Sequence, residues 1–242
     1  MDISIPIHNN EFLHGFLNIP SNPKSIIIFA HGSGSSASSP RNKFVAEILN
    51  ENGFATLLVD LLTEQEQESD IKSQKIIGKY PGIVLNKFNI HLLSDRLKTI
   101  TRWAIIENQN KDSSIEKLKD LPIGYFGAST GAAAAIEVSS STSYISNLYS
   151  DRIYAIVSRG GRPDLAYPDA LKTLKAATLF IIGEKDNKEI ISLNKKAFKQ
   201  LKNVKSKDFI SISKAGHLFD EEPRLMEKVA DISLKWFSKN LL

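Results

Sequence analysis

A serine, an aspartate and a histidine occur in this chain at positions where they could together carry out acyl transfer. Ser129 is the centre of a Gly-x-Ser-x-Gly pattern, and Asp186 and His217 follow it in that order. A serine hydroxyl is a weak nucleophile, so it needs a base within hydrogen-bond reach, and the base needs a carboxylate that orients it. These residues predict that Ser129 attacks a carbonyl, that His217 moves the proton and that Asp186 orients His217.

The sequence around Ser129 predicts a sharp turn between a strand and a helix. Ile123–Phe126 is short and apolar, as a buried strand is, and Gly131–Glu137 is rich in small residues and strong helix formers. On such a turn the backbone of the serine is strained and its hydroxyl is exposed above the sheet. Gly127 and Gly131 suit this turn because a side chain at either position would collide with the neighbouring strand or helix.

Asp186 and His217 each follow a predicted strand, where active-site loops belong. Asp186 comes shortly after the strand Thr178–Ile182, and His217 shortly after the strand Phe209–Ile212. In an open parallel sheet, ligands bind outside the carboxyl ends of the strands, so we expect both side chains on the same side as Ser129. Glu184 could replace Asp186 as the acid. Taken alone, each residue could also be an ordinary turn or surface residue, but their order and positions favour a joint site.

The segment Ala30-His31-Gly32-Ser33-Gly34-Ser35-Ser36 follows the first long apolar strand and predicts an oxyanion hole. Acyl transfer builds negative charge on the carbonyl oxygen, and losing one N–H donor to that oxygen typically costs about 3–4 kcal/mol. We expect the backbone N–H groups of Ser33 and Thr130 to be the donors. The competing interpretation is a dinucleotide site, with Asp60 binding a ribose. It is weakened because Ala37 stands where a third glycine would be needed.

Apolar strands alternate with amphipathic helices along the chain, which predicts an α/β fold with a mostly parallel sheet and helices on both faces. The expected strands are Ile3–Ile7, Phe12–Ile19, Ser25–Ala30, Phe54–Val59, Ile123–Phe126, Ile153–Val157, Thr178–Ile182 and Phe209–Ile212. The expected helices are Arg41–Asn52, Phe88–Asn108, Thr130–Ser140, Ser192–Leu201 and Pro223–Asn240. The expected irregular segments are Leu61–Lys87, with a Pro81-Gly82 turn, and the loop Ser139–Ser143. We expect residues 1–242 to form a single domain.

Composition narrows the possible functions. The 242 residues include no cysteine, which excludes disulfides, thiolate metal sites and a cysteine nucleophile. The net charge of +4 comes from lysines that are interleaved with acidic residues, which indicates solvated surfaces rather than a nucleic-acid site. The first residues do not resemble a signal peptide, and no apolar run is long enough to span a membrane. We expect a cytoplasmic protein that needs no metal or cofactor, acts on a small-molecule acyl substrate, and is either a monomer or a homodimer.

The chain resembles α/β-hydrolases of the dienelactone-hydrolase-like group over nearly all of its length. The resemblance is carried by His31-Gly32-Ser33-Gly34-Ser35-Ser36, Asp60-Leu61, Gly127-Ala128-Ser129-Thr130-Gly131, Gly183-Glu184-Lys185-Asp186 and Ala215-Gly216-His217. It implies a mostly parallel, about eight-stranded sheet and hydrolysis of an ester or related acyl bond without a cofactor. True dienelactone hydrolases have a cysteine where this chain has Ser129, which favours serine-esterase chemistry. The segment between the strands Ile153–Val157 and Thr178–Ile182 is short, so we expect no large lid domain and an open site that only Leu61–Lys87 could roof.

Two arginines are candidate substrate ligands. Arg159 follows a strand on the active-site side, and Arg41 lies near the start of the first helix. Either could bind an anionic group of the substrate, and Arg159 could equally donate hydrogen bonds to loop carbonyls. Two alternative functions stay open: a thioesterase or acyltransferase that uses the same triad, and a non-catalytic binding or regulatory module with the same fold.

Overall fold

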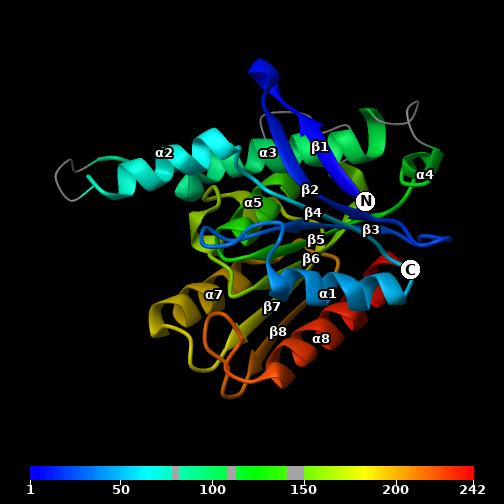
Figure 1. Cartoon of the computed structure of the whole chain (residues 1–242). Helices are drawn as coiled ribbons and strands as arrows, with labels where there is room; N and C mark the ends of the chain where they lie inside the picture. The colour runs from blue at the N-terminus through cyan, green and yellow to red at the C-terminus, as the bar shows by residue number, and fades with distance from the viewer. Residues whose placement is uncertain (78–81, 108–112, 141–149) are drawn as a thin grey trace.

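The computed structural model describes residues 1–77, 82–107, 113–140 and 150–242. Within them, one eight-stranded sheet runs through the molecule in the order β1-β2-β4-β3-β5-β6-β7-β8 (Figure 1). Only β1 and β2 run antiparallel to their neighbours, and the other strands are parallel. The expected mostly parallel sheet is therefore confirmed. The strands are β1 Asp2–Pro6, β2 Phe12–Asn18, β3 Ile26–Ala30, β4 Ala55–Val59, β5 Ile123–Ala128, β6 Ile153–Arg159, β7 Ala177–Gly183 and β8 Lys207–Ile212.

The burial of the strands follows their sequences. Every residue of β3, β4, β5 and β7 is buried, as expected for continuous apolar runs with helices on both faces. The edge strands β1 and β2 instead alternate exposed and buried residues. The central register matters for function. Ala30 at the end of β3 pairs with Gly127 of β5, and Ala128 pairs with Arg159 of β6, so the loops that follow these strands begin side by side.

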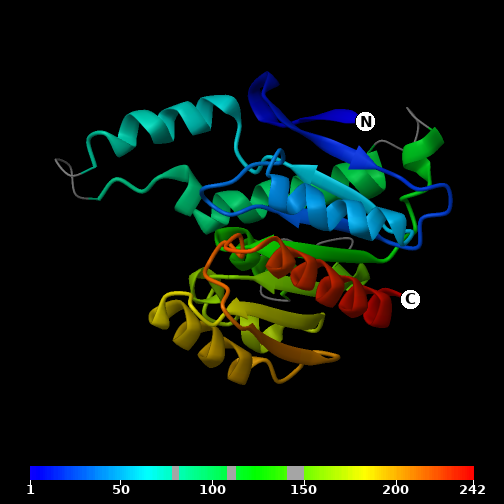
Figure 2. The ribbon, with the colours of Figure 1, turned by 60° about the horizontal axis from the view of Figure 1, so that its bottom comes forward.

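Two layers of helices cover the sheet and bury two apolar cores. On one face, α1 (Pro40–Glu51) packs against α8 (Pro223–Leu241), and the two lie beside each other in Figure 2. On the other face, α5 (Thr130–Ser139) packs against α3 (Ile90–Arg102), and α7 (Lys188–Gln200) lies farther along the sheet. No helix in the described residues is both long and apolar enough to cross a membrane.

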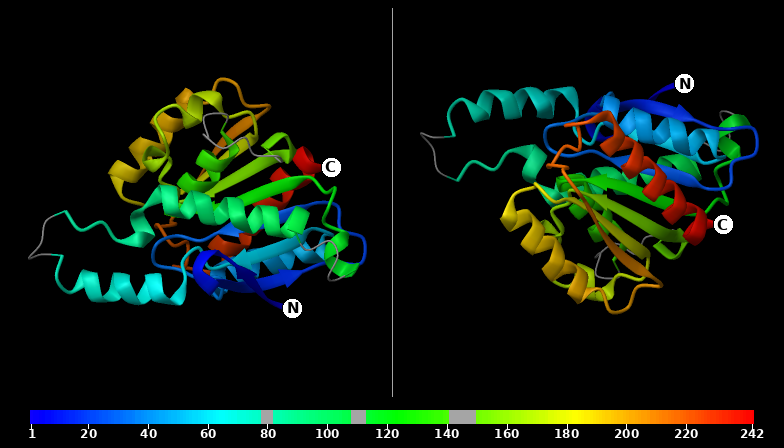
Figure 3. Two further views of the ribbon diagram at one scale, coloured as in Figure 1. Left: turned by 90° about the horizontal axis from the view of Figure 1, so that it is seen from above. Right: turned by 90° about the horizontal axis from the view of Figure 1, so that it is seen from below.

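The segment Leu61–Lys87 differs from the prediction that it is irregular. It contains the helix α2 (Glu64–Gln74), which projects from the body of the molecule together with the chain that returns from it (Figures 1 and 3). Thr63 and Glu66 form a reciprocal capping box that starts α2. Hydrophobic periodicity fails to predict α2 because ten of its eleven residues are polar; the Thr-x-x-Glu capping signal could have revealed it.

Asp70 ties the base of this projecting segment together. Its side-chain oxygens accept the backbone N–H groups of Asn86, at 2.7 Å, and Lys87, at 2.9 Å. A second tie runs to the body of the protein, where Arg96 of α3 lies 2.7 Å from a carboxylate oxygen of Glu66. These contacts hold α2 beside α3, over the loop that follows β3.

Two other helices begin at residues that differ from the predicted ones, because a polar N-cap residue, rather than the first apolar residue, sets the start of each helix. The helix predicted at Phe88–Asn108 begins at Ile90, after the cap Asn89, and changes to a π-helical turn at Trp103–Glu107. The helix predicted at Ser192–Leu201 already begins at Lys188 because Asn187 caps it. The short helices α4 (Ser113–Glu116) and α6 (Ala170–Thr173) were not predicted. Pro81, Asn108 and residues 141–143 of the predicted serine-rich loop lie outside the described residues.

Candidate active site

Ser129 lies at the sharp turn between β5 and α5. Its backbone has φ 49° and ψ −118°, a strained conformation for any residue with a side chain. Three hydrogen bonds hold the turn: its N–H donates to the carbonyl of Arg159, and its carbonyl accepts from the N–H groups of Ala132 and Arg162. A side chain at Gly131 would collide with the carbonyl of Ala30, so the close approach of α5 to the end of β3 requires glycine there. The predicted strand–turn–helix geometry is present.

Asp186 and His217 meet at the ends of neighbouring parallel strands. The Nδ1 of His217 lies 2.9 Å from Oδ2 of Asp186, whose Oδ1 accepts the N–H of Asn187 at 2.7 Å. Because both carboxylate oxygens act as acceptors, the hydrogen bond places the His217 proton on Nδ1 and leaves Nε2 free to accept another. The side chain of Asp186 is buried, while that of His217 is 38% exposed. Glu184, the alternative acid, has an exposed side chain.

Ser129 and His217 line the same two hollows on the molecular surface. The first hollow also contains Asp186, Arg162 and Lys185. The second hollow is bounded by the loop 32–35 and by Arg41 and Arg159. In the described part of the chain no hydrogen bond joins the Ser129 hydroxyl to His217. Such catalytic contacts are commonly long in free enzymes and tighten when substrate binds.

The loop that follows β3 lies directly against the turn that carries Ser129. Its Gly32 is close enough that a β-carbon there would meet Ser129, which is why this position must be glycine. The loop is held from its far end by Asp60, whose Oδ1 accepts the N–H of Ala37 at 2.8 Å. Ser33 lies between these anchors, and Thr130 is the first residue of α5. Asp60 therefore has a structural partner in this protein, which does not fit the ribose-binding role of the dinucleotide interpretation.

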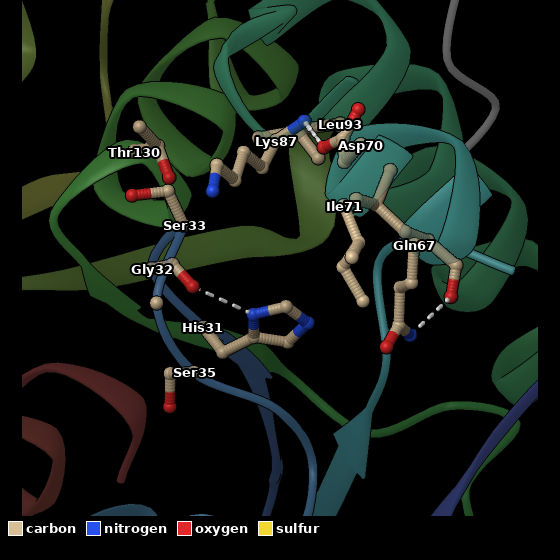
Figure 4. A pocket seen from close by; sticks show the side chains of 12 residues that line it. His31, Gly32, Ser33, Ser35, Gln67, Asp70, Ile71, Lys87, Leu93 and Thr130 are labelled. Carbon is tan, nitrogen blue, oxygen red and sulfur yellow. Dashed lines mark hydrogen bonds between the residues drawn. The ribbon is translucent and has the colours of Figure 1, made fainter. Parts of the chain in front are cut away.

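His31 fixes the start of the same loop, a role that the sequence analysis did not assign. Its Nε2 accepts the N–H of Leu61 at 2.9 Å, so the proton is on Nδ1, which donates to the carbonyl of Gly32 at 3.0 Å (Figure 4). Burial lowers the pKa of His31 below 6.5, while the Gly32 carbonyl and Asp60 oppose that change. Because Nε2 already accepts the Leu61 N–H, the 3.8 Å approach of Asp60 to Nε2 is not an ion pair at neutral pH.

Arg159 and Arg41 lie together on the second hollow. Arg159 is buried, donates to the Leu218 carbonyl at 3.4 Å and stands 5.7 Å from the centre of the Phe219 ring. Burial, followed by repulsion from Arg41, lowers the pKa of Arg159 to about 10, and Asp220 opposes this. Arg41 is paired with Asp220 at 3.1 Å. The Nε atoms of both arginines are buried without a partner in the described part of the chain, so both can still donate.

The described residues offer no cluster of metal ligands. Their His, Asp and Glu side chains form no group of three or more that could hold a metal ion.

Comparisons with known proteins agree with this geometry. No family profile matches the chain. The crystal structure of a dienelactone hydrolase from Anabaena variabilis is 39% identical to it, with a TM-score of 0.81 over 100% of this chain and 98% of that one. An esterase from Pyrococcus furiosus shares the fold, with a TM-score of 0.68 at 16% identity over 100% of this chain and 93% of that one.

A longer protein of Mycobacterium tuberculosis is also similar and carries the provisional name phosphoribosyl transferase. It is 40% identical over 227 residues, which make up 94% of this chain but 44% of that protein. The chain thus spans less than half the length of the curated relatives it matches. The Anabaena hydrolase, in contrast, matches at 39% identity over 98% of its own length. The chain therefore belongs to the dienelactone hydrolase family and has the α/β-hydrolase fold.

Proposed function

We propose that this protein is a serine hydrolase that cleaves an ester, or a related acyl bond, of a small molecule through an acyl-enzyme intermediate. The observation that carries the proposal is the partly buried Asp186–His217 hydrogen bond at the hollows that also contain the strained Ser129. Strain of this kind concentrates at functional sites, and an oriented histidine with a free Nε2 is what a serine nucleophile requires.

In the first step, Ser129 Oγ attacks the carbonyl carbon of the substrate while its proton passes to His217 Nε2. The backbone N–H groups of Ser33 and Thr130 stabilise the negative charge that develops on the carbonyl oxygen. Asp186 stabilises the positively charged His217. The intermediate collapses when His217 donates this proton to the leaving oxygen and the bond between the carbonyl carbon and that oxygen breaks. The acyl group then remains on Ser129.

In the second step, His217 takes a proton from a water molecule, which attacks the acyl group. His217 then protonates Ser129 Oγ, and the acid product departs. Hydrolysis is favoured over transfer to another acceptor because the side chain of His217 is 38% exposed and water can reach it. A thioester bond could be cleaved by the same residues.

The substrate of the proposed reaction carries an anionic group on the side of the leaving oxygen. Arg159 and Arg41 support this because both line the second hollow, into which His217 also extends, and each keeps a buried Nε without a partner among the described residues. A buried cation without a full set of partners is costly, and an anionic substrate group would offset that cost. Carboxylate and phosphate are the two groups whose geometry suits guanidinium donors.

The longer mycobacterial relative is named as a phosphoribosyl transferase, which raises the question whether the anionic group of the substrate is a phosphate or a carboxylate. This chain matches only 44% of that protein, so the transferase name can refer to the part without a counterpart here, and we do not propose phosphoribosyl transfer for this chain. A phosphorylated ester is still worth testing beside a carboxylated one. Suitable probes are 4-acetoxybenzoate, 4-acetoxyphenyl phosphate and the neutral 4-acetoxybenzamide.

The decisive experiment is labelling with a fluorophosphonate, followed by peptide mapping, with Ser129→Ala as the control. We expect a single adduct on Ser129, hydrolysis of the acetoxy probes by the wild-type protein, and loss of both in the variant. Folded Ser129→Ala protein that still hydrolyses the probes would refute the mechanism. Folded wild-type protein that neither labels nor hydrolyses any probe would support the non-catalytic alternative.

A further inference from the structure

A separate chamber adjoins the loop 31–35 on the side of the projecting segment. Figure 4 shows the side chains that line it. Its volume is about 170 Å³. Leu62, Ile71 and Leu93 supply apolar walls, and Gln67, Lys87 and Thr130 supply polar atoms. The chamber shares Gly32, Ser33 and Gly34 with the second hollow beside Ser129, so the two spaces meet at the proposed oxyanion loop.

The position of His217 decides which part of a substrate the chamber can hold. His217 must protonate the leaving oxygen, so the leaving group has to lie near it. His217 lines the two hollows beside Ser129 rather than this chamber. Once the carbonyl oxygen points at Ser33 and Thr130 and the leaving group points toward His217, the acyl substituent is directed to the remaining side, where the chamber lies.

Thr130 adds a specific chemical feature to the chamber. Its Oγ1 is buried and, among the described residues, has no hydrogen-bond partner. Three longer polar side chains of the chamber are engaged: Asp70 accepts two backbone N–H groups, Gln67 donates to the Leu62 carbonyl, and the Lys87 amine donates to Gln74. A buried hydroxyl without a partner is costly, and a ligand that pairs with it recovers that cost.

We propose that this chamber binds the acyl group of the substrate and that the Thr130 hydroxyl selects acyl groups with a hydroxyl or carbonyl oxygen next to the ester carbonyl. The proposal rests on the proposed hydrolase function. The position of the oxygen follows from covalent geometry, because the Thr130 hydroxyl and the Thr130 N–H that faces the oxyanion belong to one residue. The acyl group is short because about 170 Å³ is well below the ~300–1,000 Å³ of pockets for drug-sized ligands.

The hydroxyl preference is tested with phenyl lactate and phenyl propionate, which differ by one hydroxyl on the α-carbon. The readout is the ratio of their kcat/KM values, so that any general loss of activity cancels. We expect Thr130→Val to lower this ratio by about 3- to 10-fold, because it removes one hydrogen bond and keeps the shape of the side chain. Thr130→Ser restores the hydroxyl and is expected to keep the wild-type ratio.

The size limit is tested at Ile71, which lines the chamber but is 60% exposed and therefore tolerates replacement. Ile71→Trp is expected to lower the kcat/KM for phenyl hexanoate relative to phenyl acetate by about tenfold, and Ile71→Ala to raise it. Ile76→Trp is the matched control: Ile76 is 41% exposed in the same segment and lies outside the chamber lining.

The outcomes separate this proposal from the proposed function. If the wild-type protein hydrolyses the phenyl esters but the Thr130 and Ile71 variants keep its lactate ratio and its chain-length profile, the chamber proposal is wrong and the hydrolase function stands. If the wild-type protein neither hydrolyses the esters nor labels at Ser129, the function itself fails. A changed profile in Ile76→Trp as well as in Ile71→Trp would also overturn the chamber assignment.

Discussion

Gly32 lies so close to Ser129 that a β-carbon added at Gly32 would be 2.9 Å from the β-carbon of Ser129 and 3.2 Å from the carbonyl oxygen of Ala128. β-Carbons in proteins essentially never approach another heavy atom within 3.0 Å, so one of the two segments would have to move. This contact sets the distance between the proposed nucleophile and the proposed oxyanion loop. Both belong to tight turns at the ends of paired strands, which leaves little room for adjustment.

Gly32→Ala is therefore expected to reduce kcat by about 10- to 100-fold, because displacements near 1 Å in an active site can cost that much. Gly34→Ala is the matched control. Gly34 belongs to the same loop, and a β-carbon there meets no atom within 4 Å. Steady-state kinetics of both variants on one ester checks the prediction, and wild-type kcat in Gly32→Ala would contradict it.

The parts of the fold that were predictable from the sequence are those set by local patterns. The strand before Ser129 is a continuous apolar run, the helix after it begins with small residues, and only glycine fits at Gly131. The order of Ser129, Asp186 and His217 could be combined with the rule that parallel strands place their carboxyl ends together. The positions of the central strands, and the end of the sheet that carries the site, can thus follow from the sequence when those strands are marked by apolar runs.

The missed features depend on contacts between segments that are far apart in the chain. The role of His31 arises from the N–H of Leu61, thirty residues away, which neither composition nor periodicity reveals. Arg159 was a candidate ligand from its position. Its lowered pKa comes first from burial in the folded protein and then from Arg41, which another element brings beside it. The polar helix α2 is stabilised by its cap and by Asp70, so a search for apolar stripes does not find it.

Asp186→Asn is expected to lower kcat by about 10⁴-fold, because an amide favours the wrong histidine tautomer. Glu184→Gln is the matched control: Glu184 lies two residues away with an exposed side chain, and it was the alternative acid in the sequence. Kinetics of both variants, together with circular dichroism to show that they fold, tests the assignment. A large loss in Glu184→Gln with activity retained in Asp186→Asn would exchange the roles of the two residues.

The stability of the protein should depend on the protonation of His31. Burial lowers the pKa of His31 in the folded state below 6.5, so the unfolded chain binds a proton more readily than the folded protein does. The contribution of neutral His31 to the free energy of unfolding is therefore full above pH 6.5 and is lost as the pH falls from 6.5 toward the folded-state pKa. The loss reaches at most about 1.4 kcal/mol per pH unit. Protonation would also replace the Leu61 N–H bond to Nε2 with repulsion between two donors.

Urea unfolding of the wild-type protein and of His31→Asn at pH 7.5, 6.5 and 5.5 measures this effect. Other groups titrate in both proteins, so the difference between their unfolding free energies isolates His31. We expect the wild-type advantage to be largest at pH 7.5 and to shrink at pH 5.5. An advantage that stays constant would mean that folding leaves the pKa of His31 unchanged, and one that grows toward low pH would mean that folding raises it.

Arg159→Met should separate stability from substrate selection. Its guanidinium is buried, its pKa is lowered to about 10, and its Nε has no partner among the described residues, so the charge is unfavourable in the folded protein. Methionine fills similar space without a charge, and buried charges replaced in this way commonly leave stability unchanged or increased. We therefore expect a Tm equal to or above that of the wild-type protein.

The same Arg159→Met variant is expected to lose its preference for anionic substrates. The ratio of kcat/KM for 4-acetoxybenzoate to that for neutral 4-acetoxybenzamide should fall by about 10- to 100-fold, as expected when a hydrogen bond to a charged group is removed. Arg162→Met is the control, because Arg162 lines the other hollow and is paired with Asp164, which raises its pKa. If Arg159→Met kept the wild-type ratio while its Tm fell sharply, Arg159 would be a structural donor to the Leu218 carbonyl, and the anion selectivity would have to come from elsewhere.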